Sequence, residues 1–192
     1  MTRFFVKMKI YFVGSIKGKS KYLDNYKAII KVLKDQGVSL ICQDVLNTTE
    51  EIVSSLSDER KVKHYKNVLK WINSADVVVT EISYPSINIG HEISLALEKG
   101  KPVVALYTGK NEPHLLQGLI SEKLIILNYN FNDLKEVLKD GLKDARGQMD
   151  IRFTMLLSPK IVNFLNKISK KKNTPKSVFI RSLIEKEMEK EK

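Results

Sequence analysis

The sequence has little of what builds disulfide frameworks, metal clusters or membrane spans. Its 192 residues include a single cysteine, Cys42. One cysteine excludes an internal disulfide and any metal site that needs several thiolates, and it suits a reducing cytoplasm. No stretch approaches the roughly 18–20 consecutive apolar residues that a transmembrane helix needs. We therefore expect a cytoplasmic protein with no membrane partner, and we assign it neither a metal nor a cofactor.

Short apolar runs alternate with helical patterns through most of the chain. Strand-like runs lie at 8–15, 38–45, 76–83, 102–109 and 123–130, helical patterns at 22–37, 61–75, 92–100 and 131–145, and a polar loop at 47–60. The third and fourth runs are β-branched and almost wholly apolar, which is typical of central parallel strands covered on both faces. Strand–helix alternation implies right-handed crossovers. We predict an α/β domain at residues 1–147 with a doubly wound, flavodoxin-like sheet of five parallel strands.

The last part of the chain, residues 148–192, breaks this alternation. A strand with alternating apolar side chains is expected at 150–157, followed by two short helices that begin near Pro159 and Pro175, each after a hydroxyl cap. One strand and two short helices cannot enclose a core of their own. We predict a separate strand–helix–helix module that pairs with a second copy or lies against the main domain.

Positive charge is concentrated in that module. Residues 151–192 hold 11 Lys and Arg against 4 Glu, a net charge of +7 out of the +11 of the whole chain. Such an asymmetry favours a polyanionic partner, although a solvated, lysine-rich surface explains it as well.

Two motifs follow the first and third expected strands, at the sheet edge where doubly wound folds bind ligands. The first is GSIKGKS, residues 14–20, in which glycines let the backbone approach an anion while lysines and serines add charge and donors. Its spacing matches neither a Walker A loop nor GxGxxG, so a strand–helix turn that needs glycine explains it equally well. The second is YPSINIGHE, residues 84–92. It places Glu92 in the first turn of a helix, where the macrodipole alone favours a carboxylate by about 0.3–1 kcal/mol.

Two segments, KIYFVGSIKG (9–18) and LKWINSADVVVTEISYPSINIGHEISLALEKGKPVVALY (69–107), resemble the nucleoside 2-deoxyribosyltransferase superfamily. The resemblance is closest to its branch of 2'-deoxynucleoside 5'-phosphate N-hydrolases and covers residues 8–128. It implies that Glu92, in the G-[YH]-E turn, is the nucleophile that attacks C1' of the sugar and forms a covalent glycosyl intermediate. It also implies that Tyr11 assists at the nucleophile.

The same resemblance implies a site for the 5'-phosphate of a nucleotide. Its residues would be Gly14, Ser15, Ile16, Lys17, Gly18 and Ser86. Lys17 stands where that branch usually has arginine, so the contact with an anion is kept but a bidentate grip is lost. Gly90 and His91, beside the glutamate, are further candidates for contact with the substrate.

One position departs from the pattern of the family. There, an aspartate three residues before the tryptophan helps to protonate or position the leaving base, and Val68 occupies this place. A valine cannot transfer a proton. His64, Tyr65 and Asn67 are near in sequence but are assigned to other helix faces, and His91 is either another candidate acid or a surface residue.

Two functions therefore stay open. Either the chain is an N-glycosidase that acts on (deoxy)nucleoside 5'-monophosphates, or it is a catalytically degenerate, nucleotide-sensing transcription regulator that binds DNA. The loss of the acid at Val68 and the basic module favour the second. A nucleotide-binding scaffold that the module only dimerises is a third alternative.

Residues 150–190 resemble a ribbon–helix–helix module, in which two chains pair their strands and interlock their helices. The resemblance implies a homodimer or a higher homo-oligomer. It also implies DNA contacts from the strand and from the start of the second helix, through Arg152, Thr154, Lys176 and Ser177. Leu156 stands where such proteins usually present a polar or basic reader of the bases.

Overall fold

The structure, a computed structural model, describes residues 7–110, 112–119, 121–149, 155–172 and 174–190, and only the backbone of residues 43 and 44. The chain divides into two compact units, Met1–Asp150 and Ile151–Lys192, which are described one at a time. In the described ranges no helix is both long and apolar enough to cross a membrane.

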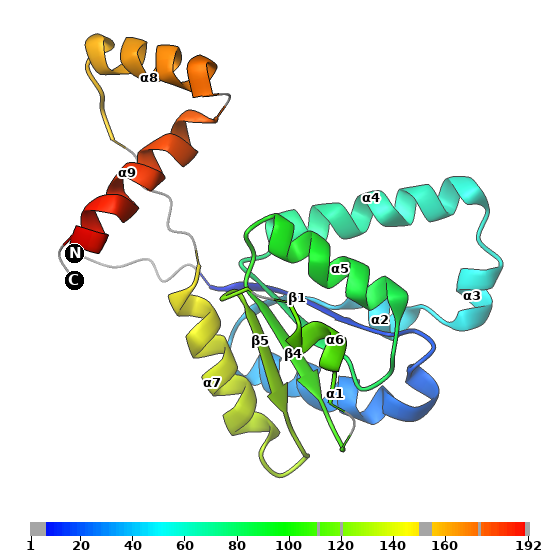
Figure 1. Cartoon of the computed structure of the whole chain (residues 1–192). Helices are drawn as coiled ribbons and strands as arrows, with labels where there is room; N and C mark the ends of the chain where they lie inside the picture. Colours follow the sequence, from blue (N-terminus) through cyan, green and yellow to red (C-terminus); the bar gives the residue numbers. More distant parts are fainter. Residues whose placement is uncertain (1–6, 111, 120, 150–154, 173, 191–192) are drawn as a thin grey trace. The chain divides into compact units, whose positions relative to one another are not determined.

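Five parallel strands form one sheet in the first unit (Figure 1). They are β1 (Lys9–Gly14), β2 (Ser39–Ile41), β3 (Val77–Glu81), β4 (Val103–Tyr107) and β5 (Leu124–Asn128). Their order across the sheet is β2-β1-β3-β4-β5, so the chain moves outward in one direction from β1 to β2 and in the other from β3 to β5. This order confirms the predicted doubly wound sheet, and it puts the switch point between the carboxyl ends of β1 and β3.

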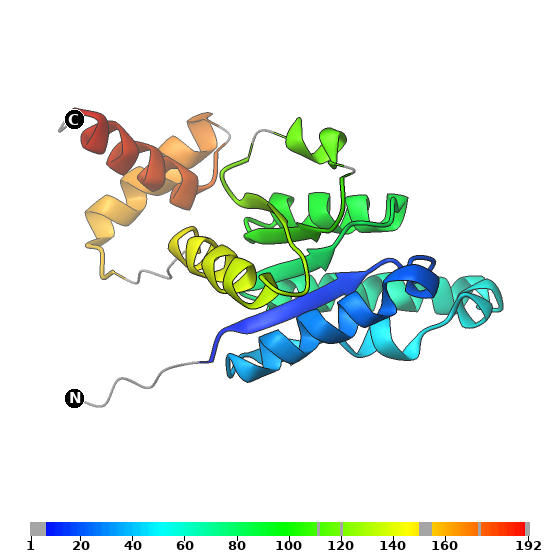
Figure 2. The same cartoon turned by 90° about the horizontal axis from the view of Figure 1, so that it is seen from below.

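Helices cover both faces of the sheet (Figures 1 and 2). On one face lie α1 (Lys19–Asp35) and α7 (Leu134–Gly147), and on the other lie α4 (Asp58–Ser74) and α5 (Ile87–Glu98); the short α6 (His114–Gln117) joins β4 to β5. Successive strand side chains point to opposite faces, so Val77 and Val79 pack toward one pair of helices and Val78 toward the other. We refer to the α1/α7 face and the α4/α5 face below.

The segment after β2 differs from the sequence-based expectation. The strand has three residues instead of the predicted 38–45, and two short helices follow, α2 (Gln43–Asn47) and α3 (Glu50–Ser54), where the sequence predicts the strand end and a loop. Cys42 and Val45 are both buried in the core of the α1/α7 face. A spacing of three residues between two core side chains suits a helix and not a strand, which explains why the predicted strand is cut short.

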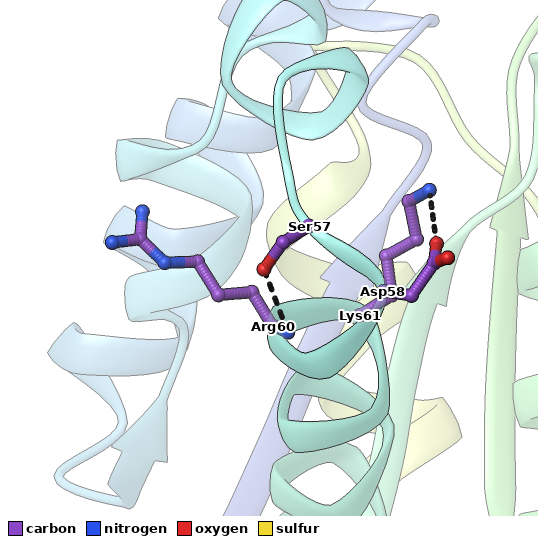
Figure 3. A network of polar contacts seen from close by, with 4 residues as sticks. All are labelled: Ser57, Asp58, Arg60 and Lys61. Carbon is purple, nitrogen blue, oxygen red and sulfur yellow. Dashed lines mark hydrogen bonds and ion pairs between the residues drawn. The ribbon is translucent and has the colours of Figure 1, made fainter.

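Helix α4 begins with a polar cap, shown in Figure 3. The hydroxyl of Ser57 accepts a hydrogen bond from the backbone N–H of Arg60 at 3.4 Å. Asp58 suits the positive end of the helix and forms an exposed ion pair with Lys61 at 3.0 Å, which contributes little to stability. This cap starts the helix before the predicted residue 61, and the 17-residue helix that follows covers the sheet beside α5.

The second unit contains, in its described part, the helices α8 (Pro159–Lys172) and α9 (Lys176–Lys190). Their Phe164 and Phe179 rings lie with centroids 6.5 Å apart. Of the strand predicted at 150–157, residues 150–154 lie outside the described residues, and residues 155–157 belong to no strand. Large apolar side chains on both helices are exposed, namely Ile161, Val162, Phe164, Val178, Leu183, Ile184 and Met188.

Candidate active site

Glu92 lies deeper in its helix than the sequence predicts. Helix α5 begins at Ile87, after Ser86 as its N-cap, whose hydroxyl accepts a hydrogen bond from the N–H of Ile89 at 3.5 Å. Gly90 therefore lies inside the helix, and Glu92 is the sixth helical residue. The predicted place in the first turn is wrong, because the helix starts at the serine cap and not at the glycine. Since the effect of the macrodipole falls off within the first turn, it does not account for a carboxylate here.

The carboxylate of Glu92 is held by a tyrosine from the centre of the sheet. The hydroxyl of Tyr11, in β1, donates a hydrogen bond to Oε2 of Glu92 at 2.9 Å. Tyr11 is buried on the α4/α5 face, with its ring centroid 5.7 Å from that of Trp71, whereas Glu92 is half-buried. The structure thus brings together two candidates that are 81 positions apart in the sequence. The hydroxyl that holds the carboxylate is thus buried, while the carboxylate itself is still reached by solvent.

Helix α4 contributes Val68 and His64 to the α4/α5 face, on which Tyr11 and Glu92 meet. Val68 is buried in one apolar cluster with Tyr11 and Ile93, so it contributes packing and no proton. His64 lies four residues earlier, hence on the same helix face, and its ring centroid is 6.3 Å from that of Trp71. The prediction that His64 needs a different helix face from Val68 is therefore wrong.

The two residues before Glu92 have unlike surroundings. His91 is exposed and its ring stacks on that of Tyr65 in α4, with centroids 6.2 Å apart and the planes tilted by 18°. A methyl group added at Gly90, by contrast, would meet no atom of the described residues within 4 Å. The packing of this unit therefore does not require glycine at position 90, although glycine weakens a helix interior by about 1 kcal/mol relative to alanine.

The predicted phosphate residues lie in two loops at the carboxyl end of the sheet. They are Gly14, Ser15, Ile16, Lys17 and Gly18 at the end of β1 and after it, and Ser86 after β3. The two loops start side by side, because Gly14 pairs with Glu81, the last residue of β3. A methyl group on Gly18 would lie 2.7 Å from Cβ of Tyr84, so the loops also touch further along. Lys17, in the first of the two loops, is exposed.

Packing accounts for the two glycines of the first loop. A methyl group on Gly14 would lie 2.8 Å from Cζ of Tyr26, and one on Gly18 would lie 2.7 Å from the Tyr26 hydroxyl oxygen. That hydroxyl donates to the carbonyl of Ser15 at 3.0 Å, and the Ser15 hydroxyl accepts from the N–H of Gly18 at 3.3 Å. The loop is therefore built tightly over Tyr26. Its glycines by themselves are no evidence for a bound anion.

One carboxylate at this edge, Glu81, is not among the site residues predicted from the sequence. It is fully buried, and its Oε1 accepts hydrogen bonds from the N–H and the hydroxyl of Ser83 and from the hydroxyl of Tyr129. Burial raises the pKa of the Glu81 carboxyl to about 6, although these hydrogen bonds act in the opposite direction. Burial, with the nearby Glu81 charge, also raises the pKa of Tyr129. The sequence does hold a signal for this residue: Glu81 is the last residue of a strand that begins with three valines, where a carboxylate is unusual.

The remaining candidates belong to the second unit. Arg152 and Thr154 lie outside the described residues. Lys176 and Ser177 are the first two residues of α9, and both are exposed. As for metals, the part of the chain that the structure describes has no group of three or more His, Cys, Asp or Glu that could hold an ion.

Comparison with known proteins identifies the family. No protein-family model matches the chain. A protein of Syntrophotalea carbinolica, named as a 2'-deoxynucleoside 5'-phosphate N-hydrolase, is 31% identical over 143 residues, which are 72% of this chain and 96% of that protein. A protein of Thermofilum pendens with the same name is 31% identical over 148 residues, 76% of this chain and 100% of that protein. The chain belongs to the 2'-deoxynucleoside 5'-phosphate N-hydrolase family.

The sheet and helices of this N-hydrolase family member also match the fold of a solved structure. The solved 2-deoxyribosyltransferase of Bacillus psychrosaccharolyticus has a TM-score of 0.50 and 24% identity, and the match covers 66% of this chain and 90% of that chain. At this identity the likeness concerns the fold alone. The family resemblance predicted from residues 9–18 and 69–107 is confirmed. The ribbon–helix–helix resemblance of residues 150–190 stays a prediction, as do the roles of the site residues.

Proposed function

We propose that this protein is an N-glycosidase that releases the base from (deoxy)nucleoside 5'-monophosphates, with Glu92 as its nucleophile. The observation that carries the proposal is the 2.9 Å hydrogen bond from the buried Tyr11 hydroxyl to the half-buried Glu92 carboxylate. The pair lies on the α4/α5 face, to which β1 and α5 both contribute. The names of the two N-hydrolase relatives support the substrate class.

The chemistry follows from a positioned carboxylate. One oxygen of Glu92 attacks C1' of the sugar while the bond from C1' to the base nitrogen breaks, and the base leaves with the electron pair and takes up a proton. Water then cleaves the ester between Glu92 and C1', which restores the carboxylate and frees the sugar phosphate. The bond from Tyr11 fixes the carboxylate, so little orientational freedom is lost when the substrate arrives.

The 5'-phosphate is assigned to the two contacting loops. Lys17 supplies an exposed positive charge, and the hydroxyls of Ser15 and Ser86 supply donors. The open space beside Gly90, two residues before Glu92, leaves room for a bound ligand. Binding by the phosphate would hold C1' over Glu92.

His64 is our candidate for the group that protonates or orients the leaving base. It lies one helical turn from Val68 on the same face of α4, and its ring is 6.3 Å from that of Trp71. Trp71 in turn lies 5.7 Å from the Tyr11 ring, so an aromatic row leads from His64 to the nucleophile. An imidazolium can donate a proton to a leaving base, which valine cannot.

The test is release of free base from a panel of deoxynucleoside and ribonucleoside 5'-monophosphates. Wild-type protein should release base, and Glu92→Ala should not. Glu98→Ala, an exposed carboxylate on the same helix, is the matched control and should keep full activity. Mass spectrometry of the quenched reaction should find a sugar phosphate on the peptide that carries Glu92. A wild-type protein that is silent across the panel would rule out the proposed catalysis.

As the alternative to catalysis, we propose a catalytically degenerate, nucleotide-sensing regulator that binds DNA through the second unit. It is favoured by the net charge of +7 over residues 151–192 and by the exposed apolar side chains of α8 and α9, which suit pairing with a second copy. Full-length protein should be retained on DNA at low salt and released as salt rises. Replacing Lys170, Lys171 and Lys172 by alanine should weaken retention. Absence of retention at low salt, or a monomer by light scattering, would contradict this function.

A further inference from the structure

The function proposed above makes no use of the most deeply buried carboxylate of the sheet. Glu81 is 0% exposed and follows Val77 and Val79 at a spacing of two, so it points to the α1/α7 face. Tyr11, the partner of Glu92, points to the other face. Glu81 therefore stands beneath the carboxyl edge and not in the space above Glu92.

A chain of hydrogen bonds ties Glu81 to three neighbouring segments. Its Oε1 accepts from the N–H of Ser83 at 3.3 Å, from the Ser83 hydroxyl, and from the Tyr129 hydroxyl at 3.3 Å. The Ser83 hydroxyl accepts from the N–H of Thr108 at 2.8 Å, and the Tyr129 hydroxyl accepts from Nδ2 of Asn25 at 2.9 Å. The cluster thus joins the ends of β3, β4 and β5 to helix α1.

The same cluster reaches the loop after β1. Gly14, where this loop begins, is the sheet partner of Glu81, and Tyr26 follows Asn25 in α1. Tyr26 supports the first loop from below, through its ring under Gly14 and its hydroxyl on the carbonyl of Ser15. The first loop therefore begins beside Glu81, and the second loop is hydrogen-bonded to Glu81 through Ser83.

Keeping a carboxylate at this position is unfavourable for the fold alone. Among the described residues, Oε2 of Glu81 is buried with no hydrogen-bond partner. Burying an unpaired polar oxygen costs free energy, and its burial is what raises the pKa of this carboxyl to about 6. Such a cost at a ligand-binding edge indicates that the charge has a task there.

We propose that Glu81 is a positioning residue, whose carboxylate holds the loop of residues 82–86 and the loop of residues 14–18 in the arrangement that receives a nucleotide phosphate. The identity of the ligand rests on the proposed function, while the positioning of the loops does not. The titratable groups that face Glu81 are Tyr26 from α1 and Tyr129 after β5, and both have raised pKa values. Between pH 5 and 8, Glu81 is thus the member of this cluster that changes its charge.

The first test compares Glu81→Gln with wild type in the binding of deoxyuridine 5'-monophosphate and of inorganic phosphate, by calorimetry from pH 5 to 8. A charged acceptor makes stronger hydrogen bonds than a neutral one, so at pH 8 wild type should bind about fivefold more tightly. The ratio should fall to about one at pH 5, where Glu81 is neutral, as glutamine is always. Titration of the phosphate itself affects both proteins alike and cancels in the ratio. In turnover, KM should change and kcat should not.

Two further variants separate positioning from mere stability. Ser83→Ala keeps the Glu81 carboxylate but removes the hydroxyl that joins it to Thr108, and it should weaken binding at pH 8, as Glu81→Ala should. Glu98→Gln, an exposed carboxylate on α5, should change nothing. If Glu81→Ala does not fold, Ser83→Ala and Glu81→Gln carry the comparison.

A ligand-free measurement keeps this proposal distinct from the proposed function. Amide hydrogen exchange at Ser83, Tyr84 and Thr108 should be faster in Ser83→Ala and in Glu81→Ala than in wild type. If wild type neither binds nor cleaves nucleotides but exchange responds in this way, the proposed function fails and the positioning role of Glu81 stands. Exchange and affinity that match wild type in all Glu81 and Ser83 variants, at every pH, would overturn the inference.

Discussion

Two carboxylates at the same edge of the sheet each accept a hydrogen bond from a tyrosine, yet their surroundings differ. On the α4/α5 face, Tyr11 donates to Glu92 at 2.9 Å, and Glu92 is half-buried. On the α1/α7 face, Tyr129 donates to Glu81 at 3.3 Å, and Glu81 is fully buried. A substrate can meet the first carboxylate but not the second. The same pair of residue types therefore suits attack on one face and support on the other, and exposure decides which.

Neutralising each carboxylate in turn should give the largest effect, and it tests directly whether the two have different roles. Glu92→Gln should lower the rate of base release by about a thousandfold or more, since the proposed mechanism loses its nucleophile. Glu81→Gln should leave kcat near that of wild type at saturating substrate. Single-turnover assays with both variants provide the measurement. Equal losses in the two would contradict the assignment of attack to one face and support to the other.

Removal of the hydroxyl that holds Glu92, the proposed nucleophile, should have the next largest effect. Tyr11→Phe keeps the ring and its contact with Trp71 but cannot donate to Glu92. We expect kcat to fall by about 10- to 100-fold, because the carboxylate loses its orientation. We also expect the free energy of unfolding to fall by about 1 kcal/mol through the lost hydrogen bond. Tyr65→Phe, at an exposed tyrosine of α4 whose ring would still stack on His91, is the control and should leave both quantities unchanged.

The buried Glu81 carboxyl should make the free energy of unfolding depend on pH. Glu81 has a pKa of about 6 in the folded protein, instead of 4.5, so the folded state binds this proton more tightly than the unfolded state. The protonated Glu81 side chain therefore adds to the free energy of unfolding, on the order of 2 kcal/mol. This addition is fully present below pH 4.5 and is lost as the pH rises through 6. Urea unfolding from pH 4 to 8 measures this. Glu81→Gln should lack the loss, and a parallel pH profile in the two proteins would argue against a buried, titrating Glu81.

The smallest effect is expected for Gly90→Ala, which tests helix stability and substrate binding separately. In Gly90→Ala the methyl group meets no described atom within 4 Å, and alanine favours a helix interior. The free energy of unfolding should therefore rise by about 0.5–1 kcal/mol. If the open space belongs to the substrate, KM should rise in the same variant. Thermal melting and initial rates check the two parts, and a stabler protein with unchanged KM would remove Gly90 from the site.

Sequence patterns predicted the architecture more closely than the local starts of its elements. Five apolar runs were enough for the doubly wound sheet, because an apolar run covered on both faces is a property of consecutive residues. The start of α5 was misplaced, since a glycine and a serine cap competed as boundaries and only the backbone path distinguishes them. That error put Glu92 in the first turn and made the helix dipole look sufficient. The family resemblance pointed to Glu92 by a different route.

The sequence by itself determined the parallel α/β fold, the family and the candidates around Glu92, because periodicity and motif spacing are contained in neighbouring residues. Only the tertiary structure decided that Tyr11 reaches Glu92 across 81 positions. It also decided that Glu81 is buried and joined by hydrogen bonds to Ser83 and Tyr129. These facts depend on which elements pack together and on what their packing shields from water. Burial and long-range hydrogen bonds exist only once the chain has folded.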